Sequence, residues 1–238
     1  MARSLFILPS TIALAAGNMA RDWLLLEDFP HPYSPRFRHY GWTQPTATFG
    51  YAQSWSSALT STPAHTTLIR RPTGGGLVQH ANDWTYALVL PADHPVARAR
   101  ATESYCAIHK ALQHALAING VPAKLAPSQN GTRRTSGNLF QICFNHPVTS
   151  DVMRANDGRK IAGAAQRRNR NGLLIQGTLD LAAAPEVRDW KVFLADFTAS
   201  LAEILNAAPE LYDGNSLSTS TFARETTRFA SAEWNQRR

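Results

Sequence analysis

Apolar residues recur at the spacing of an amphipathic helix in several stretches of the chain. In residues 104–120, SYCAIHKALQHALAING, this spacing gathers apolar side chains on one face, and a glycine ends the run. The residues of that face are Tyr105, Ile108, Leu112, Ala115 and Leu116. The same criterion predicts a helix in NMARDWLLLEDF with Asn18 as its N-cap, a helix over residues 186–205, and a last helix in FARETTRFASAEWNQRR.

Short runs rich in β-branched and aromatic residues lie between these helices and predict strands. RHYGWTQPTATFGYAQS predicts a strand, a turn and a second short element, while TTLIRRPT and WTYALVLP predict two strands with a glycine stretch bending between them. GRKIAGAAQRRNRNGLLIQGTLDL predicts two strands joined by a hairpin turn at Asn171 and Gly172. Interleaved helices and strands with a hairpin favour an α+β fold, a mixed sheet flanked by helices.

The length and composition fit one globular domain over residues 1–238. The chain has 238 residues, of which 44% are hydrophobic and 17% charged, and neither a repeat nor a long linker divides it. The N-terminal MARSLFILPSTIALAAG is similar to a signal peptide, but Pro9 and Ser10 split its apolar run. No stretch is long and apolar enough to span a bilayer, so no membrane segment is expected. The low number of cysteines favours a cytoplasmic protein with free thiols.

The charge and the cysteines narrow the classes of partner and site. A net charge of +7 favours acidic partners. The arginines come in short clusters without interleaved aromatic residues, which argues against nucleic-acid binding. Cys106 and Cys143 are too few for a disulfide framework and lack the paired spacing of a zinc site, so no metal is expected.

The segment 68–80, LIRRPTGGGLVQH, is the first candidate for chemistry. Three consecutive glycines allow positive φ and the close approach of a narrow ligand, although a tight bend is the simpler explanation of the glycines alone. The segment lacks the Gly-Lys-Ser/Thr of a phosphate loop, and no Gly-x-Gly-x-x-Gly opens a helix here. His80 at its end is, taken alone, typical of a hydrogen-bonded structural residue.

The segment DGRKIAGAAQRR is the second candidate. Lys160 stands beside a wall of small residues, where its ammonium can clamp a carboxyl or thioester carbonyl oxygen. The simpler alternative is a solvated lysine at a sheet edge.

The two thiols are the third candidate. Cys106 lies in a predicted helix near His109 and Lys110, which can lower the pKa of a thiol, but cysteines within helices are more often packing residues. Cys143 follows a short apolar strand beside His146, where either a reactive thiolate or a buried small residue fits.

Taken together, these segments resemble those of the biotin/lipoate ligase and octanoyltransferase superfamily. RRPTGGGLVQH matches the family's Arg-Arg-x-(Ser/Thr)-Gly-Gly-Gly segment with a downstream histidine, and GRKIAGAAQ matches its Gly-x-Lys-(Ile/Val)-x-Gly-(Ser/Ala)-Ala-Gln strand. The likeness continues through NMARDWLLLE, WTQPTATFGYAQ and FASAEWNQRR, so it covers nearly the whole chain.

The resemblance implies a fold and a set of site residues. The fold is an α+β, class II aminoacyl-tRNA/biotin synthetase-like fold, with a mixed β-sheet flanked by helices in a single catalytic domain over 1–238. Its glycine segment and lysine strand line a tunnel for a lipoyl or octanoyl chain. The catalytic residues implied are Lys160 and Cys143, because Cys143-Phe144 stands where the cysteine-dependent members hold their nucleophile. The substrate-binding residues implied are Arg71, Thr73, Gly74, Gly75, Gly76, His80, Gly163, Ala164 and Gln176.

The likeness is greatest to the cysteine-dependent octanoyltransferases, as in the run TYALVLPADHP. It implies transfer of an octanoyl or lipoyl group, without a cofactor, from acyl carrier protein to a lysine of lipoyl domains of 2-oxoacid dehydrogenase complexes or glycine-cleavage H protein. In the implied mechanism, Lys160 lowers the pKa of Cys143 and stabilises the oxyanion together with backbone N–H groups near Gly163 and Ala164. No nucleic acid or membrane takes part.

Two alternatives stay open on the sequence. An ATP-dependent lipoate-protein ligase would use ATP and Mg²⁺ to make an acyl-adenylate, and Cys143 would then be a packing residue. A non-catalytic acyl-chain binding protein is the other, because Gln176 stands where related sequences commonly have a histidine. Any proton-transfer duty of that histidine would be absent or taken over by His80 or His146.

Overall fold

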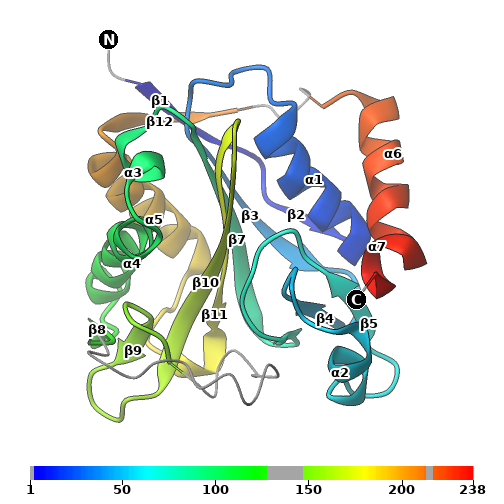
Figure 1. Ribbon diagram of the computed structural model, residues 1–238. Helices are drawn as coiled ribbons and strands as arrows, with labels where there is room; N and C mark the ends of the chain where they lie inside the picture. The colour runs from blue at the N-terminus through cyan, green and yellow to red at the C-terminus, as the bar shows by residue number, and fades with distance from the viewer. Residues whose placement is uncertain (1–2, 128–146, 213–216, 238) are drawn as a thin grey trace.

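The computed structural model describes residues 3–127, 147–212 and 217–237 (Figure 1). In this part of the chain a large mixed β-sheet has the strand order β12-β1-β3-β7-β11-β10-β9-β8, with β2 added beside β3. The pairs of β1 with β12 and β3, and of β2 with β3, are parallel, and the others are antiparallel. The strands are β1 (Arg3–Ile7), β2 (Thr11–Ala13), β3 (Arg36–Trp42), β7 (Asp83–Pro91), β8 (Ala123–Leu125), β9 (Val152–Arg154), β10 (Lys160–Asn169), β11 (Gly172–Asp180) and β12 (Ala207–Leu211).

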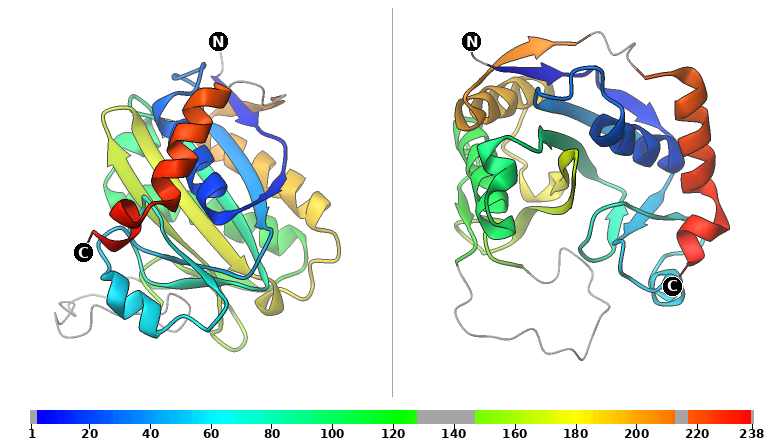
Figure 2. Two further views of the ribbon diagram at one scale, coloured as in Figure 1. Left: turned by 90° about the vertical axis from the view of Figure 1, so that its right-hand side faces the viewer. Right: turned by 45° about the horizontal axis from the view of Figure 1, so that its top comes forward.

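Helices cover both faces of this sheet (Figure 2). The helices of one face are α3 (Pro95–Arg98), α4 (Ala101–Ile118) and α5 (Trp190–Leu205), and those of the other are α1 (Ala15–Glu27) and α6 (Thr219–Ala230). In the central strand β7, Tyr86, Leu88 and Leu90 pack toward α4 and α5, while Ala87 and Val89 pack toward α1. The continuous apolar run of this strand therefore reflects burial on both faces.

A second, three-stranded sheet in the order β5-β4-β6 stands beside α1 and α7 (Figure 1). Arg70 at the end of β5 is fully buried and donates to the carbonyl oxygens of Tyr51, Gln53 and Asn235, so it joins this sheet to the C-terminal helix. The elements of this part are β4 (Thr46–Phe49), α2 (Trp55–Thr60), β5 (Thr67–Arg70), β6 (Val78–His80) and α7 (Ala232–Gln236).

The strongest local patterns in the sequence are confirmed. The mixed sheet with flanking helices is present, β10 and β11 form the predicted hairpin, and the five residues assigned to the apolar face of α4 are buried. Within the described residues, no helix has the length and apolarity needed to cross a membrane.

Two predictions about helix ends were wrong. Asn18 does not cap α1, which begins at Ala15; it lies inside the helix, where its side chain accepts from Arg38 and donates to the carbonyl oxygen of Gly41. The last predicted helix is two helices, because Ser231 has an extended backbone and its hydroxyl caps α7 at the N–H of Trp234.

Three further differences concern connections. The helix predicted over 186–205 begins at Trp190, since the Asp189 carboxylate accepts from the N–H of Lys191. The glycine stretch joins β5 to β6 within the small sheet, and β7 belongs to the large sheet. Strand β12 was not predicted, and it pairs in parallel with β1, the strand at the N-terminus.

Candidate functional site

A pocket lies where the small sheet faces strands β10 and β11 of the large sheet. The space between atoms in this region, open solvent at its mouth included, is about 420 Å³. Apart from half-buried Trp42, its solvent-accessible lining residues are exposed Gly75 and half-buried Ala164 and Ala165, so the pocket opens beside these three. Six of the nine residues predicted to bind substrate line it, namely Arg71, Gly75, His80, Gly163, Ala164 and Gln176.

Arg71 holds the glycine loop from inside. Its guanidinium donates to the carbonyl oxygen of Gly74 at 3.0 and 2.6 Å, to that of Gly76 at 2.6 Å and to that of Thr48 at 3.0 Å. Gly75 has a φ of +82°, a conformation that favours glycine, and a side chain there would press on Arg71 and Ala165. The middle glycine is therefore required by the backbone of the loop.

Thr73, Gly74 and Gly76 do not lie on the pocket wall. Thr73 is fully buried and its hydroxyl donates to Gln176 Oε1 at 2.7 Å, while Gly74 and Gly76 supply the carbonyl oxygens that Arg71 binds. These three residues shape the pocket through Gln176 and Arg71.

Lys160 belongs to a buried group at the start of β10, which we call the edge cluster: Tyr105, His109, Asp151 and Lys160. Its side chain is 3% exposed and its Nζ lies 2.7 Å from Asp151 Oδ2, so the simpler expectation of a solvated lysine was wrong. A side chain at Gly163 would collide with Lys160 Cε and Nζ, which places the ammonium against the pocket wall.

Tyr105 connects the edge cluster to the backbone of β10. Its hydroxyl donates to Asp151 Oδ1 at 2.5 Å and accepts from the N–H of Ala164 at 2.9 Å. The N–H of Ala164, expected to stabilise an oxyanion, is therefore already bound to Tyr105. His109 packs on the Tyr105 ring and its Nδ1 donates to the carbonyl oxygen of Ser150; burial lowers its pKa to about 4, so the ring is neutral at pH 7.

Gln176 belongs to a second buried group on the pocket floor, which we call the floor cluster: Asp22, Arg38, Tyr40 and Gln176. Arg38 and Asp22 form an ion pair of 2.6 Å with neither side chain exposed. Gln176 Nε2 and Tyr40 Oη donate to Asp22 Oδ2 at 2.7 and 2.9 Å. Burial raises the pKa of Asp22 and outweighs the opposing charge of Arg38 and these hydrogen bonds.

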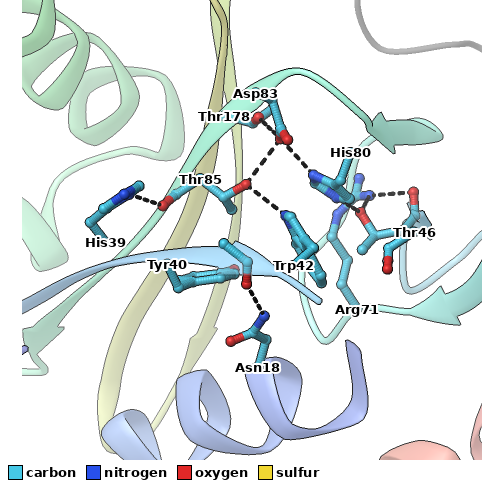
Figure 3. A network of polar contacts seen from close by, with 12 residues as sticks. Asn18, His39, Tyr40, Trp42, Thr46, Arg71, His80, Asp83, Thr85 and Thr178 are labelled. Atoms are coloured by element: carbon cyan, nitrogen blue, oxygen red, sulfur yellow. Dashed lines mark hydrogen bonds and ion pairs between the residues drawn. The ribbon is translucent and has the colours of Figure 1, made fainter. Parts of the chain in front are cut away.

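His80 is part of a polar network that spans the two sheets (Figure 3). Its Nδ1 lies 2.6 Å from Asp83 Oδ2, and because a carboxylate oxygen accepts, Nδ1 carries the proton. Its Nε2 lies 2.9 Å from the Thr48 hydroxyl, and its ring stacks on Trp42 at 4.1 Å. These contacts fix the orientation of His80, and its ring forms part of the pocket lining.

Asp83 collects the donors of that network on one oxygen (Figure 3). His80, Thr85 and Thr178 all donate to Oδ2, Thr85 at 2.9 Å. Burial alone would raise the pKa of Asp83, but the charge of His80 and the three hydrogen bonds together lower it. The carboxylate therefore stays ionised, and it ties His80, the last residue of β6, to Thr85 of β7 and Thr178 of β11.

The remaining predicted residues are the two cysteines and His146. Cys143 and His146 lie outside the described residues, and Cys106 is half-buried on α4. Within the ranges 3–127, 147–212 and 217–237, no three His, Cys, Asp or Glu side chains are grouped so that they could hold a metal ion.

Sequence reasoning missed the carboxylates that pair with the basic residues of the site. Asp22 carried a usable signal, because an acid three residues after Met19 interrupts the apolar face of a predicted helix. Asp151 carried none, since nothing local distinguishes it from a loop aspartate. Tyr105 was assigned to the apolar face of α4, where a hydroxyl gives no periodic signal.

Known proteins are similar to this chain in sequence and in fold. Octanoyltransferase LipM of Kyrpidia tusciae is 32% identical over 177 residues, which cover 72% of this chain and 64% of that protein. The chain therefore spans less than two thirds of the length of this curated relative.

Two solved structures share the fold. A T. acidophilum protein described as a lipoate protein ligase, with bound lipoic acid, superposes with a TM-score of 0.70 at 18% identity, covering 98% of this chain and 99% of that one. A bi-partite lipoate protein ligase from Thermoplasma acidophilum, studied with its E2 lipoyl domain, gives a TM-score of 0.70 at 17% identity over 99% and 97% of the chains. The family model of the lipoyl protein ligase A/B catalytic domain matches residues 15–201. The chain therefore belongs to the lipoyl protein ligase A/B catalytic domain family.

Proposed function

We propose that the protein transfers an octanoyl group from acyl carrier protein to a lysine of lipoyl domains through a cysteine thioester. The observation that carries the proposal is the position of Lys160, which is buried, held by Asp151 at 2.7 Å and pressed against Gly163 in the pocket wall. A fixed ammonium at the wall of a narrow pocket suits a carbonyl oxygen that gains negative charge during acyl transfer. The name of the LipM relative supports the same reaction.

The pocket supports an acyl chain as the group transferred. Met19, Trp42, Val78 and Ala165 contribute apolar surface to its lining, and the glycines leave the backbone open to close approach. Burial of a methylene contributes roughly 0.8 kcal/mol, so an eight-carbon chain gains several kcal/mol from such walls.

The reaction has two steps. The Cys143 thiolate attacks the thioester carbonyl, the carbon–sulfur bond to the carrier breaks, and the carrier thiolate leaves and takes a proton. The neutral amine of the acceptor lysine then attacks the enzyme thioester, loses a proton and leaves as an amide, which regenerates the cysteine. Lys160 donates to the carbonyl oxygen in both steps. Because a thioester is already activated, the route consumes no ATP.

The partners follow from charge and from the family. A net charge of +7 favours acidic domains, as expected of acyl carrier protein and of the lipoyl domains of 2-oxoacid dehydrogenase complexes or glycine-cleavage H protein. The pairing of the T. acidophilum ligase with its E2 lipoyl domain supports an acceptor of this kind. A cytoplasmic location and one catalytic domain over residues 1–238 belong to the same proposal.

Intact-protein mass spectrometry tests the proposal. The enzyme is mixed with octanoyl-acyl carrier protein in the absence of ATP, alongside Cys143→Ser and, as a matched control, Cys106→Ser. We expect a hydroxylamine-sensitive octanoyl adduct on the parent and on Cys106→Ser but none on Cys143→Ser. The adduct should pass to a lipoyl domain when one is added.

Other outcomes select the alternatives. If no adduct forms and octanoate with ATP and Mg²⁺ modifies a lipoyl domain, the protein is an ATP-dependent ligase. If neither reaction occurs and octanoate still binds, the protein is an acyl-chain binding protein. An adduct that persists in Cys143→Ser and disappears in Cys106→Ser assigns the nucleophile to α4.

A further inference from the structure

Three arginines and three aromatic residues close a ring on the surface beside the pocket, and we call it the arginine–aromatic ring. Its members in order are Trp23, Arg167, Tyr51, Arg237, Trp234 and Arg228, and Arg228 returns to Trp23. The guanidinium carbon of Arg167 lies 5.9 Å from the Trp23 centroid and 4.5 Å from that of Tyr51. Arg237 lies 4.0 and 3.9 Å from Tyr51 and Trp234, and Arg228 lies 4.5 and 5.4 Å from Trp234 and Trp23.

The fold, not the local sequence, brings this ring together. Its members come from α1, the loop after β4, β10, α6 and the C-terminal helix with the residue that follows it, and α1, α6 and α7 lie together in both views of Figure 2. Along the chain the arginine clusters contain no aromatic residues, whereas in space each ring arginine lies between two of them.

The ring adjoins the opening of the pocket. Trp23 is one helical turn, about 5.4 Å, from the pocket residue Met19, and Arg167 is two residues, roughly 6.6 Å, beyond Ala165 on the same side of β10. Tyr51 follows Gly50, where a side chain would overlap the carbonyl oxygen of Gly75. A molecule that leaves the pocket between Gly75 and Ala165 therefore meets the ring next.

Arg167 is the ring arginine best suited to receive an anion, and Arg237 lies against the same Tyr51 ring. The third, Arg228, is paired with Glu225, whose Oε2 lies 2.7 Å from its Nε, and it supports the neighbouring aromatic residues. Arg167 is half-buried and makes no hydrogen bond or ion pair with any described residue, and Arg237 is exposed. Both lie within 4.5 Å of the Tyr51 centroid, so their guanidinium carbons are less than about 9 Å apart.

Stacking orients the guanidinium of Arg167 before a ligand arrives. An arginine that stacks on an aromatic ring uses the face of its guanidinium, and its N–H groups point outward in the plane, where they match the oxygens of a phosphate. The stack also removes rotamer freedom before the ligand arrives, which lowers the entropy cost of binding. Two like charges held this close are relieved when an anion lies between them.

We propose that the arginine–aromatic ring binds the phosphodiester of the acyl donor's prosthetic arm. The inference rests on the proposed function, in which the donor thioester carbonyl lies at Lys160 and Gly163. Arg167 is four strand residues, roughly 13 Å, from Gly163, too far for the reacting group and along the side on which the arm leaves the pocket. On a pantetheine-type arm, the phosphodiester is the anionic group that can reach this position.

Calorimetric titration with non-transferable thioethers tests the inference without turnover. The probes are S-octyl-phosphopantetheine and S-octyl-pantetheine, which differ only in the phosphate. We expect the parent protein to bind the phosphorylated probe roughly tenfold or more tightly, as befits a charge-assisted contact. Arg167→Gln and Arg237→Gln should each remove most of this preference and leave the Kd for S-octyl-pantetheine unchanged. Arg167→Lys should keep part of it, and Arg170→Gln, at the exposed hairpin turn, should keep all of it.

Several results would overturn the inference while leaving the transferase intact. Equal Kd values for the two probes in the parent, or equal weakening of both probes by Arg167→Gln, would make the ring a structural support. If the arginine variants weaken only the binding of S-octyl-acyl carrier protein and of neither small probe, the ring binds acidic side chains of the carrier. If they weaken only the binding of a lipoyl domain, the ring binds the acceptor. A protein that shows the phosphate preference but forms no acyl-enzyme would instead refute the proposed function.

Discussion

The edge cluster and the floor cluster are built alike and respond differently. Each contains a fully buried aspartate that a base binds at 2.6 to 2.7 Å and a tyrosine hydroxyl supports. In the floor cluster, the partner of Asp22 is the rigid guanidinium of Arg38, with both side chains sealed from solvent. In the edge cluster, the partner of Asp151 is the flexible Lys160, whose ammonium reaches the pocket wall. The same kind of ion pair is therefore sealed from solvent in one place and lies beside Gly163 of the pocket wall in the other.

Acid should also separate the two clusters. The pKa of Asp22 is raised by burial, so its contribution to stability is complete below its unfolded pKa near 3.9 and is lost as the pH rises through the folded pKa. The pKa of His109 is lowered to about 4, so its contribution is complete above 6.5 and is lost as the pH falls through the folded value. Acidification therefore weakens the edge cluster through His109, whereas the contribution of Asp22 to the floor cluster does not fall.

The largest effect is expected from Asp22→Ala in the floor cluster. The substitution leaves Arg38 buried without its partner, which costs about 3 to 5 kcal/mol of the free energy of unfolding. Urea denaturation measures the loss. Asp93→Ala is the control, because the Arg3–Asp93 pair is exposed and such pairs contribute about 1 kcal/mol or less. Equal losses in the two variants would show that the floor cluster does not hold the fold.

Lys160→Met should act on the reaction. Loss of one charged donor to an oxyanion lowers turnover by roughly 10² to 10³-fold. The measurement is octanoyl transfer per folded molecule, with folding followed separately because Asp151 loses its partner. Lys124→Met, at an exposed position of β8, should retain the parent rate. A Lys160→Met enzyme of normal turnover would reduce the edge cluster to a second structural pair.

His109→Gln tests the difference in acid response. Between pH 6.5 and pH 4, a histidine whose pKa falls from 6.5 to about 4 on folding loses about 3 kcal/mol of its contribution to stability. The glutamine amide can still donate to the carbonyl oxygen of Ser150 but does not titrate. Urea unfolding at pH 4 and pH 7 should therefore show a loss in the parent that is about 3 kcal/mol larger than in the variant. Parallel losses would mean that acid acts elsewhere.

The elements that the sequence predicted well are those whose signal is local. Asn171-Gly172 specifies a tight turn by its own backbone preferences, and the β10–β11 hairpin followed. Strand β12 has the sequence AAPEL, which contains alanine and proline rather than β-branched residues, and its partner β1 is about 200 residues away along the chain, as in the pair of Arg3 and Ala207. No window of a few residues contains that information.

The site shows the same division. The glycine segment and Lys160 were identified by their resemblance to a family's motifs, because each taken alone fitted a tight bend or a solvated lysine better. The choice of partners was not, since Gln176 meets Asp22 across 154 positions and Lys160 meets Asp151 only after β9 and β10 pair with a register shift. Those contacts depend on topology, and the arginine–aromatic ring depends on it in the same way.

The smallest effect is expected from Tyr105→Phe. The Tyr105 hydroxyl is the group that joins the edge cluster to the N–H of Ala164. Its removal should cost about 1 kcal/mol in urea denaturation, the low end for an unsatisfied donor, because half-buried Ala164 can be reached by water. Tyr33→Phe, at a side chain 74% exposed, is the matched control and should change nothing. Transfer should fall far less than in Lys160→Met. A loss as large as that of Lys160→Met would make the Tyr105 hydroxyl part of the reaction and would extend the reactive part of the edge cluster beyond its lysine.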